Sequence, residues 1–387
     1  MNFFARTDKS FLGKWWWTVD RVTLAILMTI CIFGVVLVTA ASPSVAERID
    51  ASPNHFIIRH IIYLVPSIGL LIGLSMANLQ YVWRAALICL GFALFCMVLV
   101  PIFGDEVKGA QRWIGVGPFS LQPSELAKPA FIVVSAWFIA RQKEKPEFKG
   151  TWFAFGLYGL VVLLLVLQPD MGMTFIVTAT FFTVIFLAGM PFRYIILLAV
   201  LGVGASILIY FSFDHVQSRV DRFLNPETGD TYQISRSLQA FQHGGLLGTG
   251  AGQGTVKMTI PDAHADFIFA VAGEELGMLM TVLLVGLYGY VIVRGYNRIM
   301  DTDNVFVILA SGGILTLFGL QALINMGSSI HLLPTKGMTL PFISYGGSSL
   351  LSSGIGMGML LALTRRQGRS GIARGGLSIR PIGGNVK

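Results

Sequence analysis

The stretch VTLAILMTICIFGVVLVTAA, residues 22–41, decides the fold class. It contains no charged residue, and its length as a helix is enough to cross a hydrocarbon core of about 30 Å. Inside lipid, only helices and closed barrels satisfy the backbone, and barrel strands are short and alternating. This continuous block therefore predicts a membrane-spanning helix. Comparable blocks follow near 57–77, 82–103, 124–140, 152–168, 171–189, 192–212, 274–293, 304–327 and 343–364.

The composition of the whole chain points the same way. Of its 387 residues, 54% are hydrophobic and 12% are charged, whereas soluble domains carry about 25% charged residues. We therefore expect an all-α integral membrane protein, a ten-helix transmembrane bundle. The formal net charge of +8 suits a membrane with anionic headgroups. The sequence has no basic patch with interleaved aromatic residues, so nucleic-acid binding is not expected. The cysteines, Cys31, Cys89 and Cys96, fall inside spans, so neither a disulfide nor a zinc site is expected.

Lysine and arginine predict the orientation. The loops on the side of the two termini hold most of these residues, and cytoplasmic loops are the richer ones in membrane proteins. Both ends are therefore expected in the cytoplasm. The predicted parts are a cytoplasmic N-terminal segment (1–21), a ten-span membrane domain (22–364) and a basic cytoplasmic tail (365–387). A large extracytoplasmic loop (213–265) separates spans seven and eight.

Two short segments are expected at the membrane surface. The tryptophans 15–17, between Lys14 and Arg21, are typical of an interfacial anchor. In the large outer loop, the apolar residues Ile234, Leu238 and Phe241 recur at helical spacing. This pattern predicts a short amphipathic helix lying at the outer interface.

The most informative segment is PDAHADFIFAVAGEELG, residues 261–277. Three carboxylates, Asp266, Glu274 and Glu275, are costly beside lipid and should face a protein interior or a polar cavity. Asp266 is expected at the outer boundary, at the mouth of such a cavity. From the residues alone, Asp266 is equally well explained as a helix cap or as a catalytic base.

Two further segments place charges at the outer end. In SLQPSELAK (120–128), Glu125 and Lys128 stand at i, i+3 on one helix face. They form either an internal ion pair or a site that orients a charged lipid headgroup. In Gln168-Pro169-Asp170, the aspartate precedes a span, and a helix cap is the favoured interpretation.

Three more outer segments have weaker signals. The glycines of GGLLGTGAGQG (244–254) permit close approach of a phosphate or a sugar, but the nucleotide-binding pattern GxxxxGK[ST] is missing. PTKGMTLPFISYGGSSL (334–350) puts Lys336 at the mouth of the last span, and Arg112 beside Trp113 suits phosphate binding or anchoring. Because all these groups map to one end of the bundle, we expect them to gather around a single outward cavity.

The chain closely resembles the SEDS family (shape, elongation, division and sporulation) of bacterial peptidoglycan polymerases, and its division branch in particular. The matching segments are GAQRWIGVGPFSLQPSELAK (109–128), QPDMG (168–172), YQISRSLQAFQHGGLLGTGAGQG (232–254), PDAHADFIFAVAGEELG (261–277) and LPTKGMTLPFISYGGSSL (333–350). Ala265 stands where the family often has threonine. The resemblance implies a glycosyltransferase that polymerises lipid II at the outer face of the bacterial cytoplasmic membrane, in septal wall synthesis.

The resemblance also implies roles for residues and partners. Asp266 would be the catalytic carboxylate, and Lys128, Arg112 and Lys336, in that order, would stabilise the leaving pyrophosphate. Glu125 would position Lys128 or bind sugar. The remaining candidate substrate contacts are Asp170, Gln233, Ser237, His264 and Ser344. No metal-ligand cluster is expected, and a divalent cation (Mg or Mn) is left open. The expected partners are lipid II, a class B penicillin-binding protein and other divisome membrane proteins.

Two rival functions stay open at this stage, a lipid II flippase and the elongation-branch polymerase. A flippase needs a polar path through both leaflets. Here the polar residues concentrate at the outer ends of the predicted spans, and the inner halves are apolar. The pattern therefore favours an enzyme over a transporter.

Overall fold

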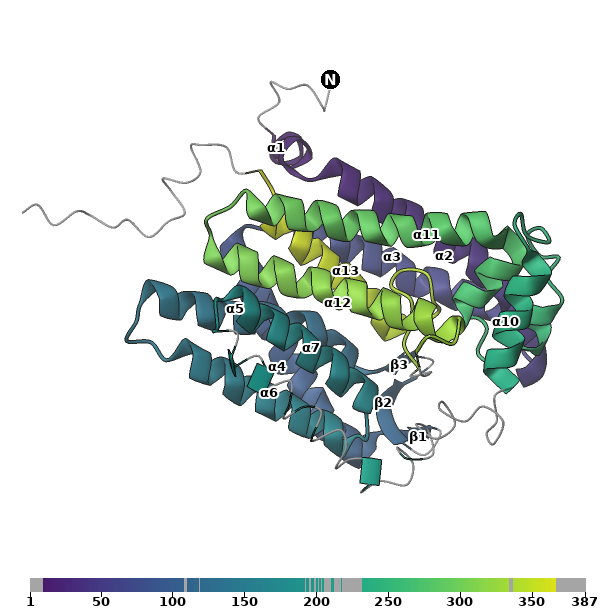
Figure 1. The fold of residues 1–387 in the computed structure, drawn as a ribbon, viewed down its shortest axis with the longest axis horizontal. Coiled ribbons are helices and arrows are strands. Elements are labelled where there is room, and N and C mark those ends of the chain that lie inside the picture. The colour runs from purple at the N-terminus through teal and green to yellow at the C-terminus, as the bar shows by residue number, and fades with distance from the viewer. Residues whose placement is uncertain are drawn as a thin grey trace, which may run out of the picture.

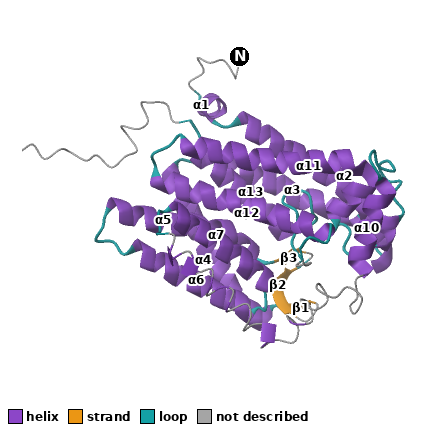
Figure 2. Ribbon diagram, in the orientation of Figure 1, coloured by secondary structure: helices purple, strands orange, loops and turns teal. Residues whose placement is uncertain are grey.

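The computed structural model describes residues 10–107, 110–117, 119–191, 232–333 and 337–366, with isolated residues between 193 and 217. Within these residues the chain is helical apart from three short strands (Figure 2). The helices are α1 (Phe11–Thr18), α2 (Arg21–Ala46), η1 (Glu47–Ile49), α3 (His55–Ser75), α4 (Leu79–Phe103), α5 (Pro123–Glu144), α6 (Gly150–Leu167), α7 (Met171–Leu187), α10 (Tyr232–Gly244), η2 (Val256–Thr259), α11 (Ile268–Met300), α12 (Val305–Ser329) and α13 (Gly347–Leu363).

Helices of membrane-spanning length make up most of the fold. By length and composition, α2, α3, α4, α6, α11 and α12 are able to cross a membrane, and α7 and α13 are apolar but shorter. Apart from 192–212, each predicted span coincides with a described helix. The expectation of a helical membrane protein is thus confirmed. The predicted seventh span and the ranges 1–9, 213–231 and 367–387 lie outside the described residues, save for a few isolated positions.

The long helices lie side by side, with α10 at one end of the bundle and α1 near the other (Figure 1). Helix α12 is the most deeply buried of the six long apolar helices. It packs against four other helices, α5, α7, α11 and α13. This helix is therefore central to the packing of the bundle.

Helices α3 and α13 meet along a seam of glycines. A Cβ atom on Gly354 would lie 2.4 Å from the carbonyl oxygen of Ser67, and one on Gly347 would lie 2.4 Å from the ring of Tyr63. The Ser67 hydroxyl donates to the carbonyl of Leu350 across the same seam. Small residues at such positions let two helix backbones approach closely inside a membrane.

A small sheet, which the sequence analysis does not predict, follows α4. Its strands β1 (Asp105–Val107), β2 (Ala110–Val116) and β3 (Phe119–Leu121) pair antiparallel in the order β1-β2-β3. In the β2–β3 pair, Ile114 is opposite Leu121. The strands of this sheet are too short to show a clear alternation of apolar and polar residues. Antiparallel pairing satisfies the backbone groups of this non-helical segment. The all-α prediction is corrected to this extent.

The described part of the large predicted loop, 232–265, packs on the ends of the long helices. It begins with α10, which confirms the expected short amphipathic helix. The Ser237 hydroxyl on its buried face donates to the carbonyl of Ser329 at the end of α12. The chain then passes through a glycine-rich turn and η2 before it reaches the turn that precedes α11.

Candidate functional site

Asp266 lies on the turn immediately before α11, and its side chain is half-buried. The N-cap of α11 is Phe267, so Asp266 does not occupy the cap position that one interpretation assigned to it. The chain after α12 passes close to this carboxylate: a Cβ atom on Gly337 would lie 3.6 Å from Oδ2 of Asp266. The carboxylate therefore faces the segment that connects α12 to α13.

Hydrogen bonds to three consecutive main-chain carbonyls, those of residues 264 to 266, hold the backbone of this turn in place. The amide of Tyr345 donates to the carbonyl of His264 at 2.9 Å. The Ser344 hydroxyl donates to that of Ala265 at 2.6 Å. The buried Asn325 side chain donates through Nδ2 to that of Asp266 at 3.0 Å. A carboxylate on a backbone held in this way has a defined position, which catalysis by proton transfer requires.

Aromatic packing covers the side of the turn next to Asp266. The ring of His264 lies 4.2 Å from that of Phe56, centroid to centroid, and 5.1 Å from that of Tyr345. His264 is almost fully buried. Its ring packs against those of Phe56 and Tyr345, and its predicted contact with substrate stays a prediction.

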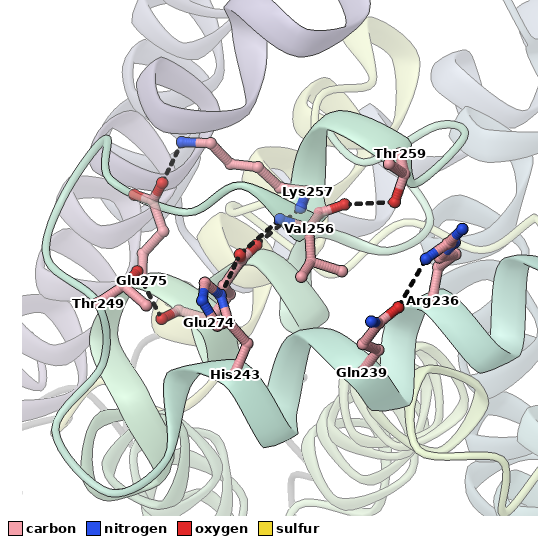
Figure 3. A network of polar contacts seen from close by, with 9 residues as sticks. All are labelled: Arg236, Gln239, His243, Thr249, Val256, Lys257, Thr259, Glu274 and Glu275. Carbon is pink, nitrogen blue, oxygen red and sulfur yellow. Dashed lines mark hydrogen bonds and ion pairs between the residues drawn. The ribbon is translucent and has the colours of Figure 1, made fainter.

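Glu274 and Glu275 lie about two turns into α11 and face the protein interior, as expected (Figure 3). Glu274 accepts hydrogen bonds from the amides of Val256 and Lys257, both at 2.7 Å, and from Nδ1 of His243 at 2.9 Å. Glu275 pairs with the ammonium of Lys257 and accepts from the amide of Gly252 at 2.8 Å. The two carboxylates therefore fasten the preceding segment, residues 243–257, to α11.

The glycine-rich stretch 244–254 packs against the same part of α11. A Cβ atom on Gly244 would lie 2.0 Å from the carbonyl of Gly273, and one on Gly248 would lie 2.2 Å from that of Glu275. Gly277, at φ +78°, interrupts the helix at this contact. These glycines thus bring two protein backbones together, whereas the sequence suggested approach of a phosphate or a sugar.

Glu125 and Lys128 form a buried ion pair in the first turns of α5. Their charged atoms are 2.9 Å apart, and the side chains are 5% and 1% exposed respectively. Pro123 starts the helix, where its missing amide hydrogen costs nothing. This geometry is the internal ion pair that was one of the two interpretations, and the pair is enclosed in the present conformation.

Arg112 and Asp170 meet at the turn between α6 and α7. The Arg112 guanidinium donates to the carbonyls of Gln168 and Pro169 and lies 3.9 Å from Oδ2 of Asp170. Asp170 caps α7 by accepting from the amide of Met173 at 3.2 Å, so its predicted role as a cap is confirmed. The Arg112 side chain, 25% exposed, is more accessible than that of Lys128.

The serines at the start of α13 connect these groups. Ser348 accepts from the amide of Gln122, just before α5, and Ser352 donates to the carbonyl of Glu125. Ser349 bonds to Thr339, in the segment that faces Asp266. The start of α13 is therefore bonded both to the beginning of α5 and to the segment that faces Asp266.

The other candidate residues differ in accessibility. The hydroxyls of Ser237 and Ser344 are buried and bonded to main-chain carbonyls, so they support the structure around the site. Gln233 is half-buried on α10, and Lys336 lies outside the described residues. Within the described part of the chain, no three His, Cys, Asp or Glu side chains are grouped as metal ligands would be.

Sequence reasoning missed Asn325 and the α13 serines. A single amide or hydroxyl in an apolar span leaves the hydropathy almost unchanged. The available signal was the polar side chain itself, since such groups are rare in spans and bond inside the protein.

A sequence model described as "Cell cycle protein", that of FtsW, RodA and SpoVE, matches residues 20–369. The chain belongs to this family. It is 42% identical to a probable peptidoglycan glycosyltransferase FtsW of Caulobacter vibrioides, over 94% of each chain. It is 37% identical to the protein of the same name from Coxiella burnetii, over 90% of this chain and 96% of the relative.

Solved structures of the FtsW, RodA and SpoVE family have the same fold. A chain from work described as "Structural coordination of polymerization and crosslinking by a peptidoglycan synthase complex" aligns with a TM-score of 0.73 at 26% identity, over 89% of this chain and 97% of the other. The rod shape determining protein RodA of Thermus thermophilus aligns with a TM-score of 0.66 at 26% identity, over 90% and 97%. The family model and the structures confirm the predicted family, and the relatives named FtsW confirm the predicted division branch.

Proposed function

We propose that this protein is a peptidoglycan glycosyltransferase that polymerises lipid II into glycan strands at the outer face of the bacterial cytoplasmic membrane, during septal wall synthesis. The relatives named FtsW support the reaction class. The observation that carries the assignment of the site is the position of Asp266, a half-buried carboxylate on a turn with three consecutive bonded carbonyls.

The proposed topology has ten spans between residues 22 and 364, with both termini in the cytoplasm and the loop 213–265 outside. The described helices that coincide with the predicted spans support this count. The excess of lysine and arginine in the loops on the side of the termini supports the orientation. Asp266 and α10 then lie at the extracytoplasmic end.

In the proposed mechanism, Asp266 acts as general base. It takes the proton from the 4-hydroxyl of the acceptor GlcNAc while that oxygen attacks the anomeric carbon of the donor. The new glycosidic bond forms as the bond from the anomeric carbon to the pyrophosphate oxygen breaks, and undecaprenyl pyrophosphate leaves. Partial burial of Asp266 suits this role, because a desolvated carboxylate is a stronger base.

Charge on the leaving pyrophosphate requires a cation. Among the described candidates we assign this role to Arg112, because its guanidinium is accessible and Lys128 is enclosed with Glu125. Lys336 remains a second candidate. A magnesium or manganese ion bound to the pyrophosphate is a further proposal, and its test is loss of polymerisation on chelation.

We also propose a class B penicillin-binding protein as partner, together with other divisome membrane proteins. The structural similarity to a chain of a peptidoglycan synthase complex that couples polymerisation and crosslinking supports this proposal. The chain would supply the polymerase, and the partner would supply the transpeptidase.

The test uses the full-length protein, purified with and without this partner and supplied with lipid II in detergent. Asp266→Asn should fold and insert normally but produce no glycan strands. Asp262→Asn is the matched control, because it makes the same change on the same turn, at a left-handed φ of 51° that asparagine tolerates. Glycan strands of normal length and yield from Asp266→Asn would refute the general-base assignment. Loss of lipid II flipping in vesicles with polymerisation intact would instead favour the flippase.

A further inference from the structure

At the end of the bundle opposite Asp266, five segments meet in one polar cluster. Trp15 in α1 donates through Nε1 to Ser75 at the end of α3. The amide of Arg366, after α13, donates to the carbonyl of Thr18, and Arg298 near the end of α11 donates to that of Thr364. Figure 1 shows α1 at this end, away from α10.

The acidic member of this cluster, Asp20, already has hydrogen-bond donors on both carboxylate oxygens. The Asp20 carboxylate, buried just before α2, accepts two bonds from Arg294 at 2.8 and 2.9 Å. It also pairs with Nε of Arg298 at 2.9 Å and accepts from the Thr23 hydroxyl at 2.8 Å. A carboxylate with four such donors has no capacity left for another cation.

Arg365 is held in the same cluster by neutral oxygens only. Its Nε donates to the Thr18 hydroxyl at 3.1 Å and its Nη1 to the carbonyl of Met76 at 2.9 Å. Among the described residues, no carboxylate lies within ion-pair distance of Arg365, and its Nη2 makes no hydrogen bond. Arg366 next to it is exposed, and Asp301 acts on Arg298 from a greater distance. The cluster therefore carries an excess of positive charge on a rigidly placed guanidinium.

The surface around the cluster is suited to a lipid headgroup layer. Phe11 and Leu12 of α1 are 66% and 53% exposed, and the Arg21 guanidinium lies 4.9 Å above the ring of Trp17. Exposed apolar side chains and tryptophans in a short helix, with cations in it and just after it, are typical of a segment that lies in the membrane interface.

We propose that Arg365 and Arg366 form a binding site for the phosphate of an anionic phospholipid, whose acyl chains pack beside Phe11 and Leu12. A planar guanidinium binds a phosphate through two parallel hydrogen bonds, and two of the Arg365 donors are already immobilised by protein oxygens. The bound lipid ties α1 to the ends of α3 and α13. The proposal of this site does not depend on the glycosyltransferase proposal or on the orientation of the protein in the membrane.

The test measures lipid binding by native mass spectrometry and thermal unfolding of the full-length protein in micelles. The probes are phosphatidylglycerol, phosphatidylcholine and inorganic phosphate. Phosphatidylglycerol should bind and raise the unfolding temperature, with little effect of phosphatidylcholine. Arg365→Gln and Arg366→Gln should each weaken phosphatidylglycerol binding about fivefold, the effect of removing one basic residue at a membrane surface.

The controls separate binding from folding. Arg141→Gln removes the same charge from an exposed ion pair with Glu144 and should leave lipid binding unchanged. If Arg365→Gln does not fold, Arg366→Gln carries the test, because the described contact of Arg366 is made by its backbone amide. Equal phosphatidylglycerol binding by wild type and Arg366→Gln would overturn the site. Equal stabilisation by inorganic phosphate and by the lipid would overturn the assignment to a phospholipid.

Discussion

Asn325 in α12 holds the main chain of Asp266. Its Nδ2 donates to the carbonyl of Asp266 at 3.0 Å and to that of Met338 at 2.6 Å. One buried amide therefore joins the turn that carries the proposed base to the segment that faces it. Asn325 is a positioning residue, because it acts through the backbone of Asp266.

Asn325→Asp should reduce polymerisation about tenfold or more, since small misplacement of a catalytic group is costly. An ionised aspartate cannot donate, so the partly buried carbonyl of Asp266 and the buried carbonyl of Met338 lose their partner, and the loss at a buried group costs about 1–3 kcal/mol. The affinity for lipid II should change less than twofold, which distinguishes misplacement of the base from general damage to the site. Asn304→Asp is the control in the same helix, where aspartate serves equally well as the N-cap. Polymerisation at the wild-type rate by Asn325→Asp would contradict the positioning role.

The buried pair Glu125–Lys128 predicts a non-additive stability effect. Lys128→Met leaves the Glu125 carboxylate buried without its partner and should cost about 3–5 kcal/mol. The double variant Glu125→Gln, Lys128→Met should regain most of this, because no unpaired charge remains. Thermal unfolding of the two single variants and the double variant measures the coupling. If the losses simply add, the pair is not a structural unit.

The glycine contact with α11 predicts a difference between two neighbouring substitutions. Gly248→Ala places a Cβ atom 2.2 Å from the carbonyl of Glu275 at a φ of +85°, whereas a Cβ atom on Gly252, at +82°, meets nothing within 4 Å. Both variants incur a backbone cost of about 1–2 kcal/mol. Gly248→Ala should lose clearly more stability and should raise hydrogen exchange in residues 245–255. Equal effects would show that the close approach is not required.

Asp20 predicts a loss of stability in acid. Burial by itself raises the pKa of this carboxyl, but the hydrogen bonds from Arg294 and Thr23 and the charge of Arg298 outweigh it and hold the pKa below the ordinary 3.8. A carboxyl with a lowered pKa stabilises the fold at neutral pH, and this stabilisation is lost as pH falls below about 4 and through the folded-state pKa.

Thermal unfolding between pH 2 and 7 measures this effect. Asp20→Asn should be less stable than wild type at pH 7, and the difference should shrink in acid. A difference that is constant over the whole range would contradict the assigned ion pairs. Glu144→Gln, at an exposed pair, provides the control with little expected effect.

Local patterns predicted the long helices, α10, the Asp170 cap and the inward-facing Glu274 and Glu275. Each of these depends on a few consecutive residues, through hydrophobic length, helical spacing or the cost of a charge in lipid. The catalytic role of Asp266 and the substrate contacts stay predictions, and they came from the resemblance to a family.

The contacts between distant segments were not predictable from such patterns. Asn325 reaches Asp266 across 59 residues of sequence, and Arg294 reaches Asp20 across 274. The Asp20 cluster also corrects the expectation that polar groups gather almost only at the outer end. Its members are single residues near helix ends, where arginine and aspartate are common and carry no signal of a cluster. Only the packing of the helices brings them together.

The glycine seam between α3 and α13 limits how the protein can open. Sliding or rotation of one helix would drive the Tyr63 ring or the backbone around Ser67 into the other, because hydrogen is the only group that fits at Gly347 and Gly354. We therefore expect the two helices to move together, and the segment that faces Asp266, which is bonded to Ser349, to move with α13.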